Sequence, residues 1–218
     1  MSGDAARWPC RRGESAGTLD GMTAAKKLHL ISVEDYLAGE LASPIKHEYL
    51  GGVVYAMAGA RNAHNLIVTN TIGVLHSRLR GRRCRVFNSD TKIRVRLPTH
   101  VRFYYADVPV ICRPNPPTDS FQDEPAVIFE VLSRRTSRID EGEKKDAYLT
   151  IASLAAYVLI EQETPAAVVF RRTEHGFVRE VYEGLNAVIP LKEIEIDLPL
   201  AEIYEAVEFT PEAPEDES

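Results

Sequence analysis

The sequence predicts an α/β domain with a mixed central β-sheet flanked by helices. Strand-length apolar runs lie between stretches of helical periodicity, in the order helix, strand, strand, strand, helix, strand. This order is typical of α/β domains. The chain has 218 residues, which is enough for one buried core. Hydrophobic residues make up 44% and charged residues 27% of the chain, and these fractions exclude a disordered composition.

We expect residues 28–207 to form this single domain. Residues 1–27 show no periodicity and are expected to be flexible, and residues 208–218 form an acidic tail that contains prolines. No apolar run approaches the ~20 residues that a membrane span needs. The N-terminal segment also lacks the apolar stretch of a signal peptide. We therefore expect a cytoplasmic protein without a membrane anchor.

The three cysteines favour the same location. Cys10, Cys84 and Cys112 are widely spaced and form no CxxC unit. This spacing argues against a disulfide framework and against a zinc site. We therefore expect unpaired cysteines in a reducing compartment.

Capping and turn signals define the N-terminal elements. Ser32 precedes two acids and is a typical N-cap, so we expect a short helix that ends near Glu40. Gly51-Gly52 lies between two apolar runs and predicts a β-hairpin. Apolar positions at helical spacing from His64 to Arg80 predict the first long helix, and Gly81 follows as its cap.

The remaining elements follow from apolar runs and periodicity. The runs at 103–112 and 126–132 are rich in β-branched residues, as in strands that are buried on both faces. We expect strands at 85–95, 103–112, 126–132 and 155–160, a helix at 138–151, a hairpin of 166–171 with 177–182, and a closing helix at 201–207.

A basic band lies inside an acidic chain. The net charge is −6, whereas residues 78–102 contain many arginines and lysines and the single acid Asp90. Because Lys and Arg neutralise phosphates, this band could hold a nucleic-acid backbone. Arg82, Arg83 and Lys92 are our candidate nucleic-acid-binding residues. The alternative for each of them is a solvated basic surface.

Two acids interrupt apolar strand patterns. Asp107 lies within the apolar segment 104–111, and Glu130 lies within 126–132. A buried ionised carboxylate must be paired, protonated or bound to a cation, because its burial alone costs several kcal/mol. Neighbouring strands can bring both carboxylates to one edge, where they would be oxygen ligands for Mg²⁺ (or Mn²⁺). The alternative for either acid is a strand-end carboxylate held by arginine or backbone donors.

Ordered motifs from about Leu30 to Glu205 resemble a known family. The matching segments are Glu34-Asp35-Tyr36-Leu37, Lys46-His47-Glu48-Tyr49-Leu50, Gly52 to Gly59, His64-Asn65, Cys84 to Phe87, Ser89-Asp90, Asp107-Val108, Glu130 to Ser133, Asp140, Gly142-Glu143-Lys144, Tyr148, Ser153-Leu154 and Tyr157. The sequence thereby resembles the Uma-type family of restriction-endonuclease-like proteins, which is abundant in cyanobacteria and is a branch of the PD-(D/E)XK nuclease superfamily. The resemblance implies a restriction-endonuclease-like core in which Asp107 is the first acid of the motif and Glu130 the second.

The chain departs from the family pattern at several positions. Ala106 stands where proline usually precedes the first acid, and Gly51 replaces an aspartate of the hairpin turn. The segment Ser133-Arg134-Arg135-Thr136 replaces Ser-Pro-Ser-Thr beside the expected site. Leu132 occupies the position of the superfamily lysine two residues after the second acid, and leucine cannot stabilise a phosphate.

The resemblance places the missing lysine in the next helix, at Lys144. Asp140, Lys144 and Tyr148 are spaced i, i+4 and i+8 and so lie on one helical stripe. The stripe could face the acids, with Lys144 stabilising the transition state. The alternative from the residues alone is an exposed Asp140–Lys144 pair worth ~0.3–0.5 kcal/mol. Lys92 is the second candidate lysine.

Glu48 and His64 complete the candidate catalytic residues. Glu48, in the first hairpin, could add a third carboxylate. His64, at the start of the long helix, could accept a proton or bind phosphate together with the helix N-terminus. The alternative for His64 is a side chain that bonds its own helix.

The sequence thus predicts Mg²⁺-dependent hydrolysis of DNA phosphodiester bonds. Asp107 and Glu130 would bind the cation, and Lys144 would offset charge in the transition state. The alternative is a nuclease fold that has lost catalysis and binds DNA or a protein partner. By analogy with restriction nucleases, we expect a homodimer.

Overall fold

The computed structural model describes residues 30–132 and 142–209. Its helices are α1 (Val33–Ala42), α2 (Asn62–Leu79), α4 (Glu143–Leu149), α5 (Leu200–Ile203) and the 3-10 helix η1 (Lys192–Ile194). Its strands are β1 (His47–Leu50), β2 (Val53–Ala56), β3 (Arg85–Val86), β4 (Lys92–Arg96), β5 (Val101–Tyr105), β6 (Val108–Ile111), β7 (Phe121–Gln122), β8 (Pro125–Leu132), β9 (Ala156–Glu161), β10 (Ala166–Thr173), β11 (Gly176–Glu183), β12 (Val188–Leu191) and β13 (Ile196–Pro199).

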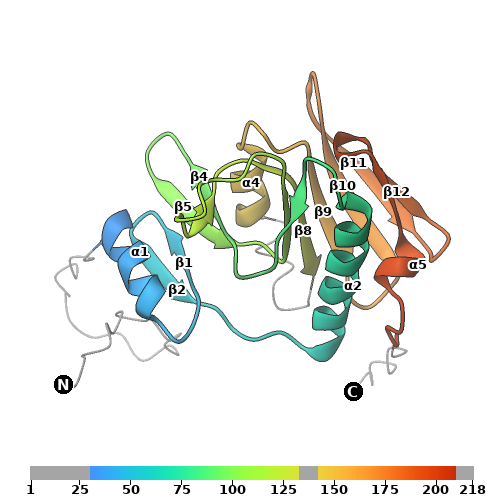
Figure 1. Ribbon diagram of the computed structural model, residues 1–218, viewed down its shortest axis with the longest axis horizontal. Coiled ribbons are helices and arrows are strands. Elements are labelled where there is room, and N and C mark those ends of the chain that lie inside the picture. Colours follow the sequence, from blue (N-terminus) through green and yellow to red (C-terminus); the bar gives the residue numbers. More distant parts are fainter. Residues whose placement is uncertain (1–29, 133–141, 210–218) are drawn as a thin grey trace, which may run out of the picture.

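Two larger sheets and one hairpin make up the fold (Figure 1). The six-stranded sheet has the order β11-β10-β9-β8-β6-β3, and the five-stranded sheet has the order β2-β1-β5-β4-β7. Both are mixed, because β8 pairs parallel with β9 and β4 pairs parallel with β7. The predicted α/β class with mixed strand pairing and flanking helices is therefore confirmed, but the strands form two larger sheets in place of one central sheet. No helix in the described part of the chain is long and apolar enough to span a bilayer.

The N-terminal helix and hairpin form as predicted. Ser32 caps α1, since its side-chain oxygen accepts the N–H of Asp35 at 3.0 Å. Gly51 and Gly52 have φ values of 58° and 101°, which a side chain would disfavour, and they allow the tight turn between β1 and β2. This hairpin joins the five-stranded sheet through β5.

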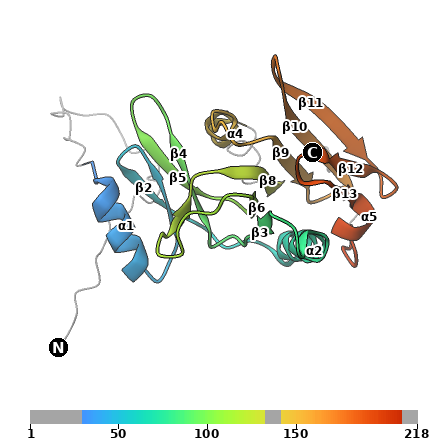
Figure 2. The same cartoon turned by 45° about the horizontal axis from the view of Figure 1, so that its top comes forward.

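The six-stranded sheet lies between α2 and α4 (Figure 2). Alternate residues of β8 face the two helices: Val127, Phe129 and Val131 pack in the cluster that contains α2, and Ile128 and Leu132 pack in the cluster that contains α4. Glu130 shares the face of Ile128 and Leu132, as strand alternation predicted. Its carboxylate is therefore directed to the α4 side of the sheet.

Two of the expected strands are each broken in two. The segment 85–95 divides into β3 and β4, because a turn closes with the Thr91 N–H donating to the Asn88 carbonyl at 3.0 Å. The segment 103–112 divides into β5 and β6 at Ala106-Asp107. In both cases the two halves belong to different sheets, so the chain crosses between the sheets at these breaks. Asp107 thus lies at the junction of the sheets rather than inside a strand.

The C-terminal half follows the prediction with smaller differences. The expected hairpin is β10 with β11, and α5 is shorter than the helix expected at 201–207. Strands β12 and β13 were not predicted. The expected helix at 138–151 corresponds to α4 from Glu143, and its first residues lie outside the described residues. Residues 1–29, 133–141 and 210–218, which include the predicted N-terminal segment and most of the predicted tail, also lie outside them.

The prediction of unpaired cysteines is wrong. Cys84 and Cys112 form a disulfide across a sequence separation of 28 residues. They meet because β3 and β6 pair antiparallel, with Arg85 opposite Ile111, so the residues just outside this pair are neighbours. Spacing along the chain could not reveal this pairing. The cysteines therefore give no support to a reducing compartment.

Reduction of this disulfide is expected to destabilise the fold. Closing a loop of this length restricts the unfolded chain and contributes about 3–4 kcal/mol to the free energy of unfolding. Urea unfolding with and without a thiol reductant measures the difference, and a Cys84→Ala/Cys112→Ala variant controls for other effects of the reductant. Equal stability of the oxidised and reduced protein would contradict the prediction.

Candidate active site

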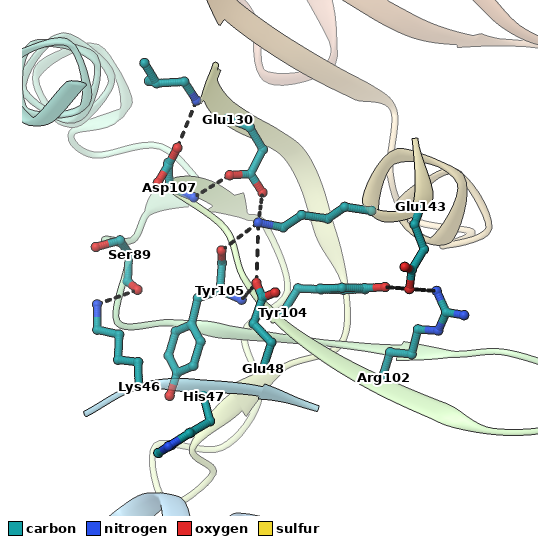
Figure 3. Close-up of polar contacts among 12 residues, drawn as sticks. Lys46, His47, Glu48, Ser89, Arg102, Tyr104, Tyr105, Asp107, Glu130 and Glu143 are labelled. Atoms are coloured by element: carbon teal, nitrogen blue, oxygen red, sulfur yellow. Dashed lines mark hydrogen bonds and ion pairs between the residues drawn. The ribbon is translucent and has the colours of Figure 1, made fainter. Parts of the chain in front are cut away.

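Asp107 and Glu130 lie side by side where β5 runs into β6. Each acid binds the backbone beside the other: the Asp107 N–H donates to Glu130 Oε2 at 3.2 Å, and the Val131 N–H donates to Asp107 Oδ2 at 2.8 Å. Figure 3 shows the two side chains next to each other. Backbone donors therefore hold both acids, as one of the alternatives predicted, and they also fix the two carboxylates at one place.

Lys144 connects Glu130 to a third acid. Its Nζ lies 2.9 Å from Glu130 Oε1 and 3.5 Å from Glu48 Oε1, and it donates to the Tyr105 carbonyl at 3.1 Å. The Glu130 and Lys144 side chains are only 3% and 7% exposed. Burial in a low dielectric strengthens this ion pair relative to a surface pair. Lys144 is therefore buried rather than exposed, and within the described residues it contacts Glu130 and Glu48.

The stripe predicted on the second helix faces the sheet. Lys144 and Tyr148 are both buried on α4. Tyr148 packs edge-on against Tyr104 of β5 and tilted against Tyr157 of β9, at ring-centroid distances of 5.5 Å and 5.6 Å. This aromatic packing orients α4 so that Lys144 reaches the acids. Asp140 lies outside the described residues.

His64 reaches Asp107 from the other side of the sheet. It lies in the first turn of α2, and its Nε2 is 3.2 Å from Asp107 Oδ2. Burial raises the pKa of Asp107, but the His64 hydrogen bond, the positive charges of His64 and Lys144 and the Val131 N–H together hold that pKa below its ordinary value. The Asp107 side chain keeps 19% of its surface exposed. Asp107 is thus an ionised carboxylate that solvent can reach.

The lowered pKa of Asp107 predicts an acid-dependent stability. A carboxyl group whose folded pKa lies below its unfolded pKa contributes stability above the unfolded value of about 4, and this contribution is lost as pH falls through the folded pKa. We compare the free energy of unfolding of the wild type with that of Asp107→Asn. The advantage of the wild type is expected to decrease as the pH is lowered beyond about 4. Urea titrations from pH 3 to pH 7 measure it. A difference that does not vary with pH would contradict the assignment.

The acids fit a hard divalent cation. Within the described residues Asp107 Oδ1 and Glu48 Oε2 accept no hydrogen bond, since the contacts of these acids use Oδ2 and Oε1. Mg²⁺ takes one or two carboxylates from a protein and keeps several waters. The described residues hold no group of three or more His, Cys, Asp or Glu side chains arranged for a metal. For Asp107 and Glu130 to hold a cation together, Glu130 would have to exchange its contact with Lys144 or with the Asp107 N–H for the cation.

The second candidate lysine lies on another face. Lys92 pairs with Tyr105 in the β4–β5 ladder, and its Nζ donates to the Tyr105 hydroxyl at 3.3 Å. Phe103 packs on Tyr36 of α1. Because residues two apart in a strand share a face, the Tyr105 side chain also lies on the α1 side of β5. Tyr104 projects from the opposite face toward α4. Lys92 is thus separated from the acids by the sheet, whereas Lys144 contacts Glu130.

The candidate DNA-binding arginines lie far from the acids. Arg82 and Arg83 follow the C-terminal end of α2, and His64 lies near its beginning. A helix of 18 residues is about 27 Å long. Arg82 donates to the Glu195 carbonyl at 2.7 Å, and Arg83 donates to the Cys112 carbonyl at 3.3 Å. Other members of the basic band pair with acids: Arg78 with Glu202, Arg94 and Arg96 with Asp123, and Arg102 with Glu143.

The sequence did not reveal the role of Tyr105. Its backbone carbonyl accepts from Lys144, and its N–H donates to Glu48 Oε1 at 3.3 Å. Backbone groups carry no signal in the residue type, so a motif search does not find them. Glu40 and His47 were also missed as members of a polar cluster, because the contacts of Glu40 with His47 and with the Tyr105 hydroxyl depend on how α1 packs on the sheet.

The fold is a mixed α/β architecture that a solved structure shares. A crystal structure described as a putative nuclease belonging to DUF820, from Anabaena variabilis, matches with a TM-score of 0.63 and 18% identity. The match covers 80% of this chain and 97% of that chain. At 18% identity, this similarity establishes the fold of the chain and not its activity.

The family follows from the sequence comparison. The model of the Uma2 family, described as "Putative restriction endonuclease", matches residues 33–201. The chain belongs to this family, which confirms the resemblance seen in its motifs. The uncharacterized protein slr1290 of Synechocystis sp. is 28% identical over 180 residues, which are 82% of this chain and 94% of that protein. A second Synechocystis protein, sll1609, is 31% identical over 136 residues, which are 61% and 76% of the two chains.

Proposed function

We propose that this protein is a Mg²⁺- or Mn²⁺-dependent endonuclease that hydrolyses phosphodiester bonds of DNA. The observation that carries the proposal is the convergence of Asp107, Glu130 and Lys144 at the junction of the two sheets, with Asp107 open to solvent. Membership in the restriction-endonuclease family supports a nuclease-like function and DNA as substrate.

Each residue has a defined task in this proposal. Asp107 and Glu130 hold the divalent cation, which would offset negative charge that develops on the phosphodiester. Lys144 brings a fixed ammonium to the same place, where low dielectric strengthens its effect on the transition state. Glu48 holds Lys144 from the neighbouring sheet. His64 keeps Asp107 ionised and oriented through its Nε2 contact.

The basic residues proposed to bind DNA lie beyond the end of α2 that is opposite His64. Arg82 and Arg83 could contact the DNA backbone only at a distance from the scissile bond, because α2 separates them from His64. The homodimer and the cytoplasmic location also stay predictions. Sedimentation of the purified protein measures its oligomeric state.

A cleavage assay tests the proposal. Supercoiled plasmid is incubated with the wild type, with Asp107→Asn and with Asp123→Asn, in the presence of Mg²⁺ or Mn²⁺. We expect Asp107→Asn to slow cleavage by about 100-fold or more, because even outer partners of metal ligands contribute 10–100-fold. Asp123 is the matched control, since it is also a half-buried acid with a lowered pKa, but it is bound by Arg94 outside the site.

The second candidate is a nuclease fold without catalysis that binds DNA or a protein. Two observations favour it: Leu132 replaces the lysine of the motif, and the oxygens of Glu130 already contact Lys144 and the Asp107 N–H. The same assay separates the two functions. Retention of plasmid by the wild type and by Asp107→Asn in a mobility-shift gel, without cleavage by either, would favour the binding module.

A further inference from the structure

A second polar cluster lies under the candidate active site, on the α1 side of the five-stranded sheet. The Glu40 cluster consists of Glu40, His47, Lys92 and Tyr105. Glu40 Oε1 accepts the His47 N–H at 2.8 Å and the Tyr105 hydroxyl at 2.9 Å, and Oε2 lies 3.0 Å from His47 Nδ1. Lys92 completes the cluster through the Tyr105 hydroxyl. Glu40, His47 and Lys92 are each no more than 8% exposed.

Aromatic packing also contributes to holding α1 on the sheet. Tyr36 of α1 is fully buried against Tyr49 and Phe103, with ring-centroid distances of 5.0 Å and 5.4 Å. These apolar contacts already hold α1 on the sheet. Buried charges carry a desolvation penalty, and apolar side chains of similar volume are often as stable or more stable. The stability of α1 alone therefore does not explain why charged rather than apolar side chains are buried here.

The cluster holds the backbone on which two site residues depend. His47, whose N–H binds Glu40, directly precedes Glu48 in β1. The Tyr105 hydroxyl donates to Glu40. The Tyr105 carbonyl accepts a hydrogen bond from Lys144, and the Tyr105 N–H donates to Glu48. The Tyr105 side chain lies on the α1 side and its backbone partners lie on the α4 side. In Figure 3, the Glu48 side chain is directed toward the backbone of Tyr105, and the His47 ring points away from it.

We propose that Glu40 and Tyr105 are positioning residues, which fix Glu48 and Lys144 against Glu130 by anchoring β1 and β5 from the opposite face of the sheet. The inference rests on the proposed function, because Lys144 matters for catalysis only if the site is a nuclease. Glu40 and Tyr105 touch neither the acids Asp107 and Glu130 nor the scissile bond. They act through the backbone of Tyr105 and through Glu48.

Removal of one hydroxyl tests this proposal without a change of shape. Tyr105→Phe deletes the bond to Glu40 and keeps the ring. Tyr204→Phe is the matched control, since the buried Tyr204 hydroxyl donates to the carbonyls of Glu161 and Ala166, in the cluster on the α2 side. A second variant, Glu40→Ala, removes the anchor itself. Circular dichroism and thermal unfolding compare the folding of the three variants.

Two readouts are measured, and one of them does not depend on catalysis. The first is the rate at which an amine-acylating reagent modifies Lys144, followed by peptide mass spectrometry. We expect about three- to tenfold faster modification in Tyr105→Phe, because loss of one buried hydrogen bond increases local opening by about this factor. The second is plasmid cleavage, with an expected loss of about tenfold or more in kcat and little change in KM.

The outcomes separate the two hypotheses. Faster modification of Lys144 in Tyr105→Phe and Glu40→Ala, with Tyr204→Phe unchanged, supports the positioning role even if the wild type cuts no DNA, in which case only the proposed function fails. Equal modification of Lys144 in Tyr105→Phe, Tyr204→Phe and the wild type overturns the positioning role. Equal loss of cleavage in Tyr105→Phe and Tyr204→Phe overturns it as well, because a general loss of stability would then explain both.

Discussion

A Lys144→Met protein is expected to lose DNA cleavage by about 100-fold or more, because it removes the ammonium that faces the proposed cation site. The same change leaves Glu130, which is 3% exposed, without the Lys144 ion pair. Breaking a buried ion pair from one side costs about 3–5 kcal/mol. Cleavage kinetics measure the first effect, and urea unfolding measures the second.

Lys145→Met is the matched control for this prediction. Lys145 is the next residue of α4, its side chain is 24% exposed, and its acidic contact is Asp146 at 3.8 Å. We expect its stability to change by less than about 1 kcal/mol, as for other surface pairs, and its cleavage rate to stay close to that of the wild type. Full cleavage by Lys144→Met would remove Lys144 from the proposed mechanism, whatever its effect on stability.

The choice between the two candidate lysines depended on long-range structure. The sequence places Lys92 on a strand and Lys144 on a helix, but the residue type does not show which of the two lies near the acids. Strand alternation then directs Lys92 to the α1 side with Tyr105, and the packing of Tyr148 turns Lys144 to the α4 side with Glu130. Alternation along one strand is a local property. Which face of a sheet meets which helix is a tertiary property, so the residues alone left the choice open.

Local patterns predicted the elements well, and pairing between distant segments was predicted less well. The cap at Ser32, the turn at Gly51-Gly52 and the alternation around Glu130 depend on neighbours in the chain, and the structure has all three. The break at Asp107 depends on two sheets sharing one chain segment, and apolar composition does not reveal it. The same limit applies to the disulfide, whose cysteines meet only because β3 pairs with β6.

The position of Asp107 explains how an acid in an apolar run can serve a cation. Had segment 103–112 been one buried strand, this carboxylate would have been enclosed between layers. Because the chain crosses between the sheets at Ala106-Asp107, the side chain keeps solvent on one side and takes the Val131 N–H on the other. A hydrated cation can approach such a group without first unfolding the sheet.

Addition of Mg²⁺ or Mn²⁺ is therefore expected to stabilise the folded protein. A ligand at 100 times its dissociation constant adds about 2.7 kcal/mol to the free energy of unfolding. For a domain of this size that corresponds to a rise in Tm of about 5–10 °C. The rise is expected to disappear in Asp107→Asn/Glu130→Gln, which lacks both charges, and to persist in Asp123→Asn.

The Lys144→Met protein makes this metal prediction sharper. Without the ammonium, Glu130 and Glu48 repel each other across the site, so the unliganded protein has more to gain from a divalent cation. We expect the Mn²⁺-induced rise in Tm to be larger in Lys144→Met than in the wild type, although cleavage is lost. Sodium chloride at matched ionic strength controls for screening of surface charge. If neither protein responds to millimolar Mn²⁺, the carboxylates at the sheet junction serve structure alone, with Lys144 as their permanent counter-ion.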